Sequence, residues 1–258
     1  MTIRKFSKEF FTTEKLIELD GDYIRLTELG IDVSHALRCA DAATSTYLYI
    51  ADPKGEMALA VSDMTICDRI TPAYLNAHLP LLQNAQVVVA DANIPAESLR
   101  WLAENCTAPL FIDPVSTKKA EKLRPILSKI HTLKPNKLEA ELLSGIPIHT
   151  LQDVELAAKK LLSTGLQRVF ISMGADGVYA ADGGEELWLP NLPGNMVNTT
   201  GCGDAFMAAL VWAYLEGTEL EGTLRAGLAA SGIAIETTET INPAMSAELL
   251  RERIRANS

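Results

Sequence analysis

The segment with the clearest chemical potential is a glycine turn that runs directly into a long apolar helical pattern. It reads Asn198-Thr-Thr-Gly201-Cys202-Gly203-Asp204 and is followed by AFMAALVWAYLEG. Two glycines separated by one small residue let the backbone turn tightly with its amides exposed, and the following helix adds the positive end of its dipole. The residues Gly201, Cys202 and Gly203 therefore predict an anion hole that could stabilise charge on a transferred phosphoryl group.

Asp204 directly follows this turn and is predicted to act as a general base. A carboxylate in this place can accept the proton of a hydroxyl group that attacks a phosphoryl group in line. The alternative is that Asp204 only caps the helix, because Asp is favoured at helix starts. The segment is not a P-loop, since no Gly-Lys-Ser/Thr sequence follows the glycines. Taken alone, the pattern leaves both interpretations open.

A second candidate pair lies in the segment KPNKLEAE, where Asn136 and Glu139 stand three residues apart. One amide and one carboxylate just beyond a strand end can position Mg²⁺, which prefers oxygen ligands and keeps several waters. The alternative is a capping box, in which Asn136 caps a helix and Glu139 completes the cap. The sequence predicts a magnesium site here without excluding the cap.

From residue 85 onward, the chain predicts the framework that these residues need. Short apolar runs rich in β-branched residues alternate with stretches of helical period, which is typical of a parallel sheet covered by helices. The predicted strands are Val87–Ala90, Leu110–Ile112, Ile130–Leu133 and Val169–Ser172. The predicted helices are Glu97–Asn105, Lys118–Ser128 and Val154–Ser163, with two more that start at Ala205 and near Leu220. A hairpin is expected over Gly177–Leu189. These patterns predict an α/β fold with a mostly parallel sheet flanked by helices.

The early region has a different pattern. Thr46–Ile50 and Met57–Val61 alternate in polarity and are joined by the turn Asp52-Pro53-Lys54-Gly55, which predicts a β-hairpin. We expect residues 44–64 to form a small flap, used as a lid over a cleft or in dimerisation. The alternative is an antiparallel edge extension of the main sheet.

Composition narrows the function classes. The chain has 258 residues, 48% of them hydrophobic, and a formal charge of −10, which argues against a protein that grips a nucleic-acid backbone. No apolar run approaches a membrane span, and MTIRKFSKEFF does not resemble a signal peptide, so we expect a cytoplasmic protein without nucleic-acid or membrane partners. The four cysteines form no CxxC pair and are expected to be isolated thiols; they are Cys39, Cys67, Cys106 and Cys202.

The segment NTTGCGDAF resembles the C-terminal signature of the PfkB (ribokinase-like) carbohydrate kinases, which usually has Asp first and Ala between the glycines. In that family the final Asp is the catalytic base and the Gly-x-Gly turn is the anion hole, which agrees with the roles predicted above. The resemblance implies a ribokinase-like three-layer sandwich, with ATP and Mg²⁺ as cofactors. The resemblance also implies a monovalent cation near the site, and Asn198 in place of Asp removes a negative charge there, which leaves the strength of that requirement open.

Other segments extend this resemblance. KPNKLEAE contains the Asn-x-x-Glu element of the family, which implies that Asn136 and Glu139 organise magnesium. VFISMGADGVYA resembles the nucleotide-binding strand and turn. The resemblance thus implies cofactor contacts at Ser172, Gly174, Gly177 and Thr200.

Within the family, ADANIPAESL, FIDPVS and GEMALAVSDM look most like the pseudouridine kinase subgroup. This implies ATP-dependent phosphorylation of the 5′-hydroxyl of a nucleoside, with pseudouridine as substrate. Asn93 and Asp113 end predicted strands at the presumed cleft and are predicted to contact the substrate. The alternatives are a kinase for another small sugar or nucleoside, and a truncated nucleotide-binding protein with little activity.

The start of the chain departs from the family pattern. Family members begin with a strand that carries a substrate-binding Asp and with a Gly-Gly element, and neither is visible before Ile31. We therefore expect residues 1–258 to form a single, N-terminally shortened kinase domain with weakened substrate binding. A lost strand would expose a sheet edge, which predicts a homodimer.

Overall fold

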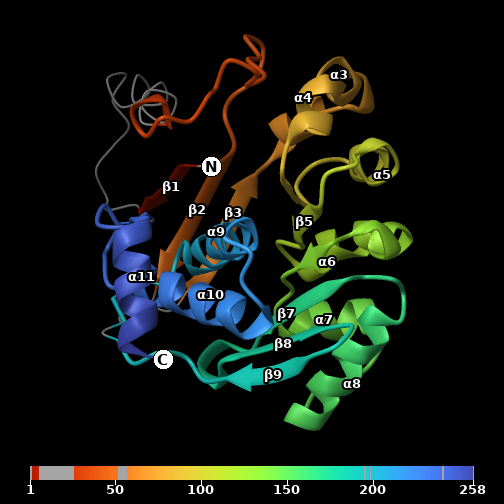
Figure 1. Cartoon of the computed structure of the whole chain (residues 1–258). Helices are drawn as coiled ribbons and strands as arrows, with labels where there is room; N and C mark the ends of the chain where they lie inside the picture. The colour runs from red at the N-terminus through yellow and green to blue at the C-terminus, as the bar shows by residue number, and fades with distance from the viewer. Residues whose placement is uncertain are drawn as a thin grey trace. The chain divides into compact units, whose positions relative to one another are not determined.

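The computed structural model describes residues 2–5, 26–51, 57–194, 196–197, 199–239 and 241–257. The chain divides into two compact units, Met1–His78 and Leu79–Ser258, shown in Figure 1 and described separately below. The predicted turn at residues 52–55 and the substituted signature position Asn198 lie outside the described residues.

The first unit contains a three-stranded sheet. Its strands, in spatial order, are β1 (Thr2–Lys5), β2 (Thr46–Ala51) and β3 (Met57–Asp63), followed by a 3-10 helix η1 (Thr65–Arg69) and by α3 (Pro72–Ala77). β1 and β2 are parallel, whereas β2 and β3 are antiparallel. The predicted hairpin is thus confirmed. The edge-extension alternative is wrong, because among the described residues these strands form a sheet of their own. A role as lid or dimerisation flap stays a prediction.

The second unit is built on a six-stranded sheet whose spatial order follows the chain. The strands are β4 (Val88–Asp91), β5 (Leu110–Asp113), β6 (Thr132–Leu133), β7 (Arg168–Ser172), β8 (Val178–Asp182) and β9 (Glu186–Leu189). β4 to β7 pair in parallel, whereas β8 and β9 form the predicted antiparallel hairpin at one edge. The prediction of a mostly parallel α/β sheet is confirmed.

Helices cover both faces of this sheet. They are α4 (Leu79–Asn84), α5 (Ala96–Asn105), α6 (Thr117–Ala120), η2 (Glu121–Lys129), α7 (Lys137–Ser144), α8 (Leu151–Leu162), η3 (Gly174–Asp176), α9 (Cys202–Leu215), α10 (Leu220–Ala234) and α11 (Ala247–Ala256). Within the described part of the chain, no helix is both long and apolar enough to span a bilayer. All four cysteines are free, as predicted.

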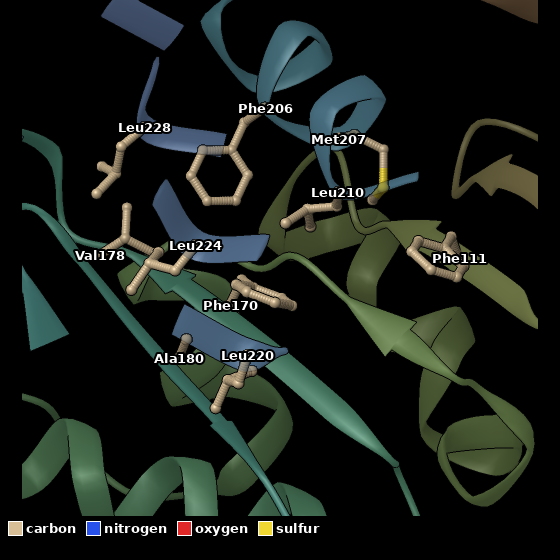
Figure 2. Packing of buried hydrophobic residues seen from close by; sticks show 10 residues of the cluster. All are labelled: Phe111, Phe170, Val178, Ala180, Phe206, Met207, Leu210, Leu220, Leu224 and Leu228. Atoms are coloured by element: carbon tan, nitrogen blue, oxygen red, sulfur yellow. The ribbon is translucent and has the colours of Figure 1, made fainter. Parts of the chain in front are cut away.

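The main hydrophobic core lies between the sheet and the helices α9 and α10. Successive strand residues point to opposite faces, and on β8 Val178 and Ala180 join a buried cluster with Phe206 of α9 and Leu224 of α10 (Figure 2). Tyr179 points to the other face, and its pKa is raised by burial, by a hydrogen bond to Glu186 and by nearby negative charge that includes Glu155 of α8. Helices therefore sandwich the sheet, which confirms the three-layer architecture.

Several helix boundaries differ from the prediction: α8 begins three residues early, at Leu151, where Thr150 caps it, and two further differences have identifiable reasons. The expected helix Lys118–Ser128 is a short α6 that continues as the 3-10 helix η2, because Pro125 lacks an N–H group for an α-helical hydrogen bond. The helix expected from Ala205 begins at Cys202, since Gly201 with φ 86° serves as its N-cap. The second correction places Asp204 inside the first helical turn.

Gly177 fixes the turn between β7 and β8. Its φ is +86°, and a Cβ atom there would lie 2.2 Å from the Leu189 carbonyl oxygen and 2.8 Å from the Pro190 Cα. We expect Gly177→Ala to lower the free energy of unfolding by at least about 2 kcal/mol. The new Cβ would force the backbone of Leu189 and Pro190 to move, and alanine would be strained at this positive φ. Urea denaturation measures this. Gly174→Ala is the matched control, since φ is +61° there but nothing lies within 4 Å, and it should cost only about 1 kcal/mol. Equal costs for the two variants would contradict the argument.

Candidate active site

A cavity of about 390 Å³ opens in the second unit at the carboxyl ends of the sheet strands. This edge of a parallel α/β sheet is where ligands usually bind. The cavity wall combines polar residues from the strand ends and the start of α9 with apolar residues from α10 and the 191–196 segment. Its lining residues are Lys134, Ser172, Gly174, Ala175, Gly177, Val178, Asn191, Leu192, Met196, Thr199, Cys202, Gly203, Phe206, Leu228, Ser231, Gly232 and Ile235.

The start of α9 forms one end of this cavity. Gly201 is the N-cap and provides no side-chain cap, and the Cys202 N–H donates only a long hydrogen bond, of 3.4 Å, to the Thr199 carbonyl oxygen. Cys202 and Gly203 follow as the first helical residues and line the cavity. Ser231 of α10 donates a hydrogen bond from Oγ to the Cys202 carbonyl oxygen at 3.1 Å, which ties the turn to α10. This arrangement has the geometry of an anion-binding helix start.

Asp204 lies in the first turn of α9, and its side chain is accessible to solvent. Because Gly201 occupies the N-cap position without a side-chain cap, the interpretation of Asp204 as the capping residue is not supported. Partial burial is the main cause that raises the pKa of its carboxyl group; the negative charges of Asp113 and Asp91 raise it further, and Lys134 opposes them. Asp204 is thus a carboxylate close to other charges at the same edge of the sheet.

Lys134 is a site residue that the sequence patterns did not single out. It follows β6 directly, is only 8% exposed, and lines the cavity. Its Nζ lies 2.9 Å from Asp113 Oδ2, and a Cβ atom built on Gly203 would lie 3.3 Å from the same Nζ. The ammonium group is therefore held between the end of β5 and the start of α9. Its signal in the sequence is its place directly after a buried strand, where a charged residue is unexpected unless it is paired.

The predicted substrate residues lie on neighbouring strand ends. Asp91 and Asp113 are paired in register between β4 and β5. Asp91 accepts hydrogen bonds from the Asn93 backbone N–H at 2.8 Å and from Asn93 Nδ2 at 2.7 Å, while Asn93 Oδ1 accepts from Lys119. The Asn93 side chain is thus engaged in holding Asp91. Asp91 is a second residue that the sequence patterns missed, and substrate contact by Asn93 stays a prediction.

Asn136 and Glu139 form the capping box of α7. The Glu139 N–H donates to Asn136 Oδ1 at 3.0 Å, and the Asn136 N–H donates to Glu139 Oε2 at 2.8 Å. Burial is the main cause that raises the pKa of Glu139, and the negative charge of Asp113 adds to it. The capping interpretation is confirmed.

Magnesium binding by the same pair stays a prediction. Among the described residues, no group of three or more His, Cys, Asp or Glu side chains is arranged to hold a metal ion. A closed protein cage is not what Mg²⁺ requires, since it keeps several waters and takes ligands from phosphates. Asn136 and Glu139 have the oxygen atoms that suit such an open site, so the donor set fits magnesium.

Of the predicted nucleotide-binding residues, Ser172, Gly174 and Gly177 lie in the cavity wall. At the glycine turn, Thr199 is among the described lining residues and Thr200 is not, so a nucleotide contact by Thr200 stays a prediction. Asn191 and Ser231 also line the cavity and were not predicted. They come from a loop and from the middle of a helix, where no local pattern marks a ligand contact.

Comparisons with known proteins show which family the chain resembles. Residues 23–247 match the family model described as pfkB family carbohydrate kinase. The chain is 42% identical over 219 residues to the pseudouridine kinase of Escherichia coli K12, covering 84% of this chain and 70% of that protein. It is 36% identical over 223 residues to an uncharacterized sugar kinase of the same bacterium, covering 85% of this chain and 61% of that protein.

A solved structure, the ribokinase of Thermotoga maritima, shares the fold with a TM-score of 0.80 at 22% identity, covering 92% of this chain and 77% of that one. The family model spans most of the chain, and the matched range includes the turn that opens α9. The chain belongs to the pfkB family of ATP-dependent carbohydrate kinases.

Proposed function

We propose that this kinase transfers the γ-phosphoryl group of ATP to the 5′-hydroxyl of a nucleoside, with pseudouridine as the substrate. The observation that carries the proposal is the cavity that ends at the uncapped start of α9, with Asp204 in the same turn. The identity to the E. coli pseudouridine kinase supports the choice of acceptor.

The residues divide the chemistry between them. Asp204 accepts the proton of the acceptor hydroxyl, and the oxygen of that hydroxyl forms a bond to the γ-phosphorus of ATP. The bond from the γ-phosphorus to the β,γ-bridging oxygen breaks, which releases ADP. The N–H groups of the Gly201-Cys202-Gly203 turn, with Lys134, stabilise the charge on the transferred group. Asn136 and Glu139 would hold Mg²⁺ near the phosphates, and the bound ion would neutralise phosphate charge.

The direct test is a turnover assay with purified protein, ATP and Mg²⁺. The acceptor panel contains pseudouridine, uridine, adenosine, ribose and fructose 6-phosphate, and mass spectrometry identifies the phosphorylated product. We expect pseudouridine 5′-phosphate to form with the highest kcat/KM. Phosphorylation of the free sugars alone would contradict the nucleoside assignment and would favour a sugar kinase, the class to which the second E. coli relative is assigned by its name.

The pH dependence of turnover gives an independent check on Asp204. Only the ionised Asp204 carboxylate can accept a proton, so activity should fall as pH falls through the pKa of Asp204. Burial and the charges of Asp113 and Asp91 raise this pKa above the ordinary aspartate value of 3.8, so the acid limb of the pH profile should lie above that value. Asp113→Asn removes a negative charge that raises the pKa, so the acid limb of kcat/KM should move to lower pH. A limb that moves to higher pH or stays in place would contradict this assignment.

Three other expectations stay predictions. They are a monovalent-cation requirement, a homodimeric state, and a single shortened kinase domain over residues 1–258. Turnover with and without K⁺ and light scattering of the purified protein test the first two. Asn198, the position on which the cation question depends, lies outside the described residues.

A further inference from the structure

Val115 has an unusual backbone conformation directly after β5. Of the non-glycine residues that the structure describes, it alone has a positive φ, at 67°. The Ser116 N–H donates to the Pro114 carbonyl oxygen at 2.8 Å, which closes a three-residue γ-turn around Val115. A β-branched side chain disfavours positive φ because its Cβ crowds the backbone. Gly or Asn would adopt the same turn with less strain.

Packing within the chain leaves part of Val115 uncovered. The residue is 40% exposed, so some of its apolar surface stays available to another molecule. Residues with a strained backbone conformation are typical of ligand-binding and catalytic sites. The stabilising contact for Val115 is thus expected from a molecule that the free chain does not contain.

The position of Val115 indicates which molecule this is. Its N–H donates to Asp113 Oδ1 at 2.9 Å, and the other carboxylate oxygen of Asp113 accepts from Lys134 Nζ at 2.9 Å. The turn therefore stands beside the charged groups of the active site. Val115 is not among the described residues that line the cavity, whose wall contains the predicted nucleotide-binding residues Ser172, Gly174 and Gly177. This leaves the acceptor, rather than the nucleotide, as the ligand within its reach.

We propose that Val115 is a specificity-determining residue of the acceptor site, where its isopropyl group packs against an apolar face of the bound acceptor. The face of a nucleobase or the C–H face of a ribose ring has this chemistry. The proposal rests on the kinase function proposed above and adds a named acceptor contact to it.

The test compares Val115→Gly and Val115→Asn with the wild type. Both variants relieve strain and remove the isopropyl group, so we expect a Tm at or above the wild-type value. The acceptor kcat/KM should fall about tenfold, as for other small apolar contacts in specificity pockets. The KM for ATP should stay within about twofold of the wild-type value.

Val89→Gly is the matched control, because Val89 is also exposed, at 53%, but lies in regular strand β4. This variant should lower Tm, since glycine weakens a strand interior, and leave the acceptor kcat/KM unchanged.

An unchanged acceptor kcat/KM in both Val115 variants would overturn the proposal, as would a loss of Tm as large as that of Val89→Gly. If the wild-type protein phosphorylates no acceptor in the panel, the proposed kinase function itself fails and the Val115 proposal falls with it. That outcome is seen in the wild-type assay, so the two failures are distinguishable.

Discussion

Asp204→Asn is expected to lower kcat by at least about a hundredfold, because the amide cannot accept the proton of the attacking hydroxyl. The substitution keeps the size of the side chain, so ATP affinity should change little. Rapid-quench or steady-state assays measure kcat, and calorimetry measures ATP binding. Asp68→Asn, at an exposed position of η1, is a control that should leave both unchanged. Full turnover by Asp204→Asn would remove the general-base role and would favour a nucleotide-binding protein.

Lys134→Met is expected to lower kcat by about a hundredfold, the usual cost of losing one preorganised group that stabilises transition-state charge. Methionine keeps much of the length of the side chain but loses the ammonium group that lies between Asp113 and Gly203. The acid limb of the pH profile should also move to higher pH, since Lys134 lowers the pKa of Asp204. Near-normal kcat in this variant would show that Lys134 only pairs with Asp113.

Lys134→Met should also affect stability, and this effect needs its own control. Loss of Lys134 leaves the Asp113 carboxylate without its cation, which should cost about 1–3 kcal/mol of stability. The double variant Asp113→Asn/Lys134→Met removes that charge, so stability should recover while kcat stays low. Recovery of both together would mean that the activity loss came from instability. Lys159→Met, at an exposed ion pair with Glu155, should affect neither property strongly.

The elements that the sequence predicted best are those whose residues are apolar on both faces. β5 and β7 are buried strands with few polar residues, so their sequence pattern predicts strands inside a parallel sheet. The start of α9 was placed three residues late, because the positive φ of Gly201 allows the helix to begin as soon as the turn ends. The two-residue strand β6 is shorter than its apolar run, since pairing with its neighbours, and not local composition, sets its length.

The sequence identified candidate site residues that follow one another along the chain. It missed residues that come together only in the folded structure. The glycine turn and Asp204 are contiguous, so the sequence marks them as candidates, although their spacing alone leaves the capping interpretation open. Lys134 and Asp91 gain their roles only when separate strand ends meet at one edge of the sheet. The strain at Val115 is equally invisible in the sequence, because DPVST contains no residue that requires a positive φ.

The sheet of the second unit is ordered along the chain, from β4 through β9. During synthesis each strand can join its predecessor as soon as it leaves the ribosome, which favours rapid assembly from local pairings. The helices α9 and α10, which cover one face of the sheet, emerge only after all six of these strands. One apolar face of the nascent sheet therefore stays uncovered until α9 and α10 have been synthesised.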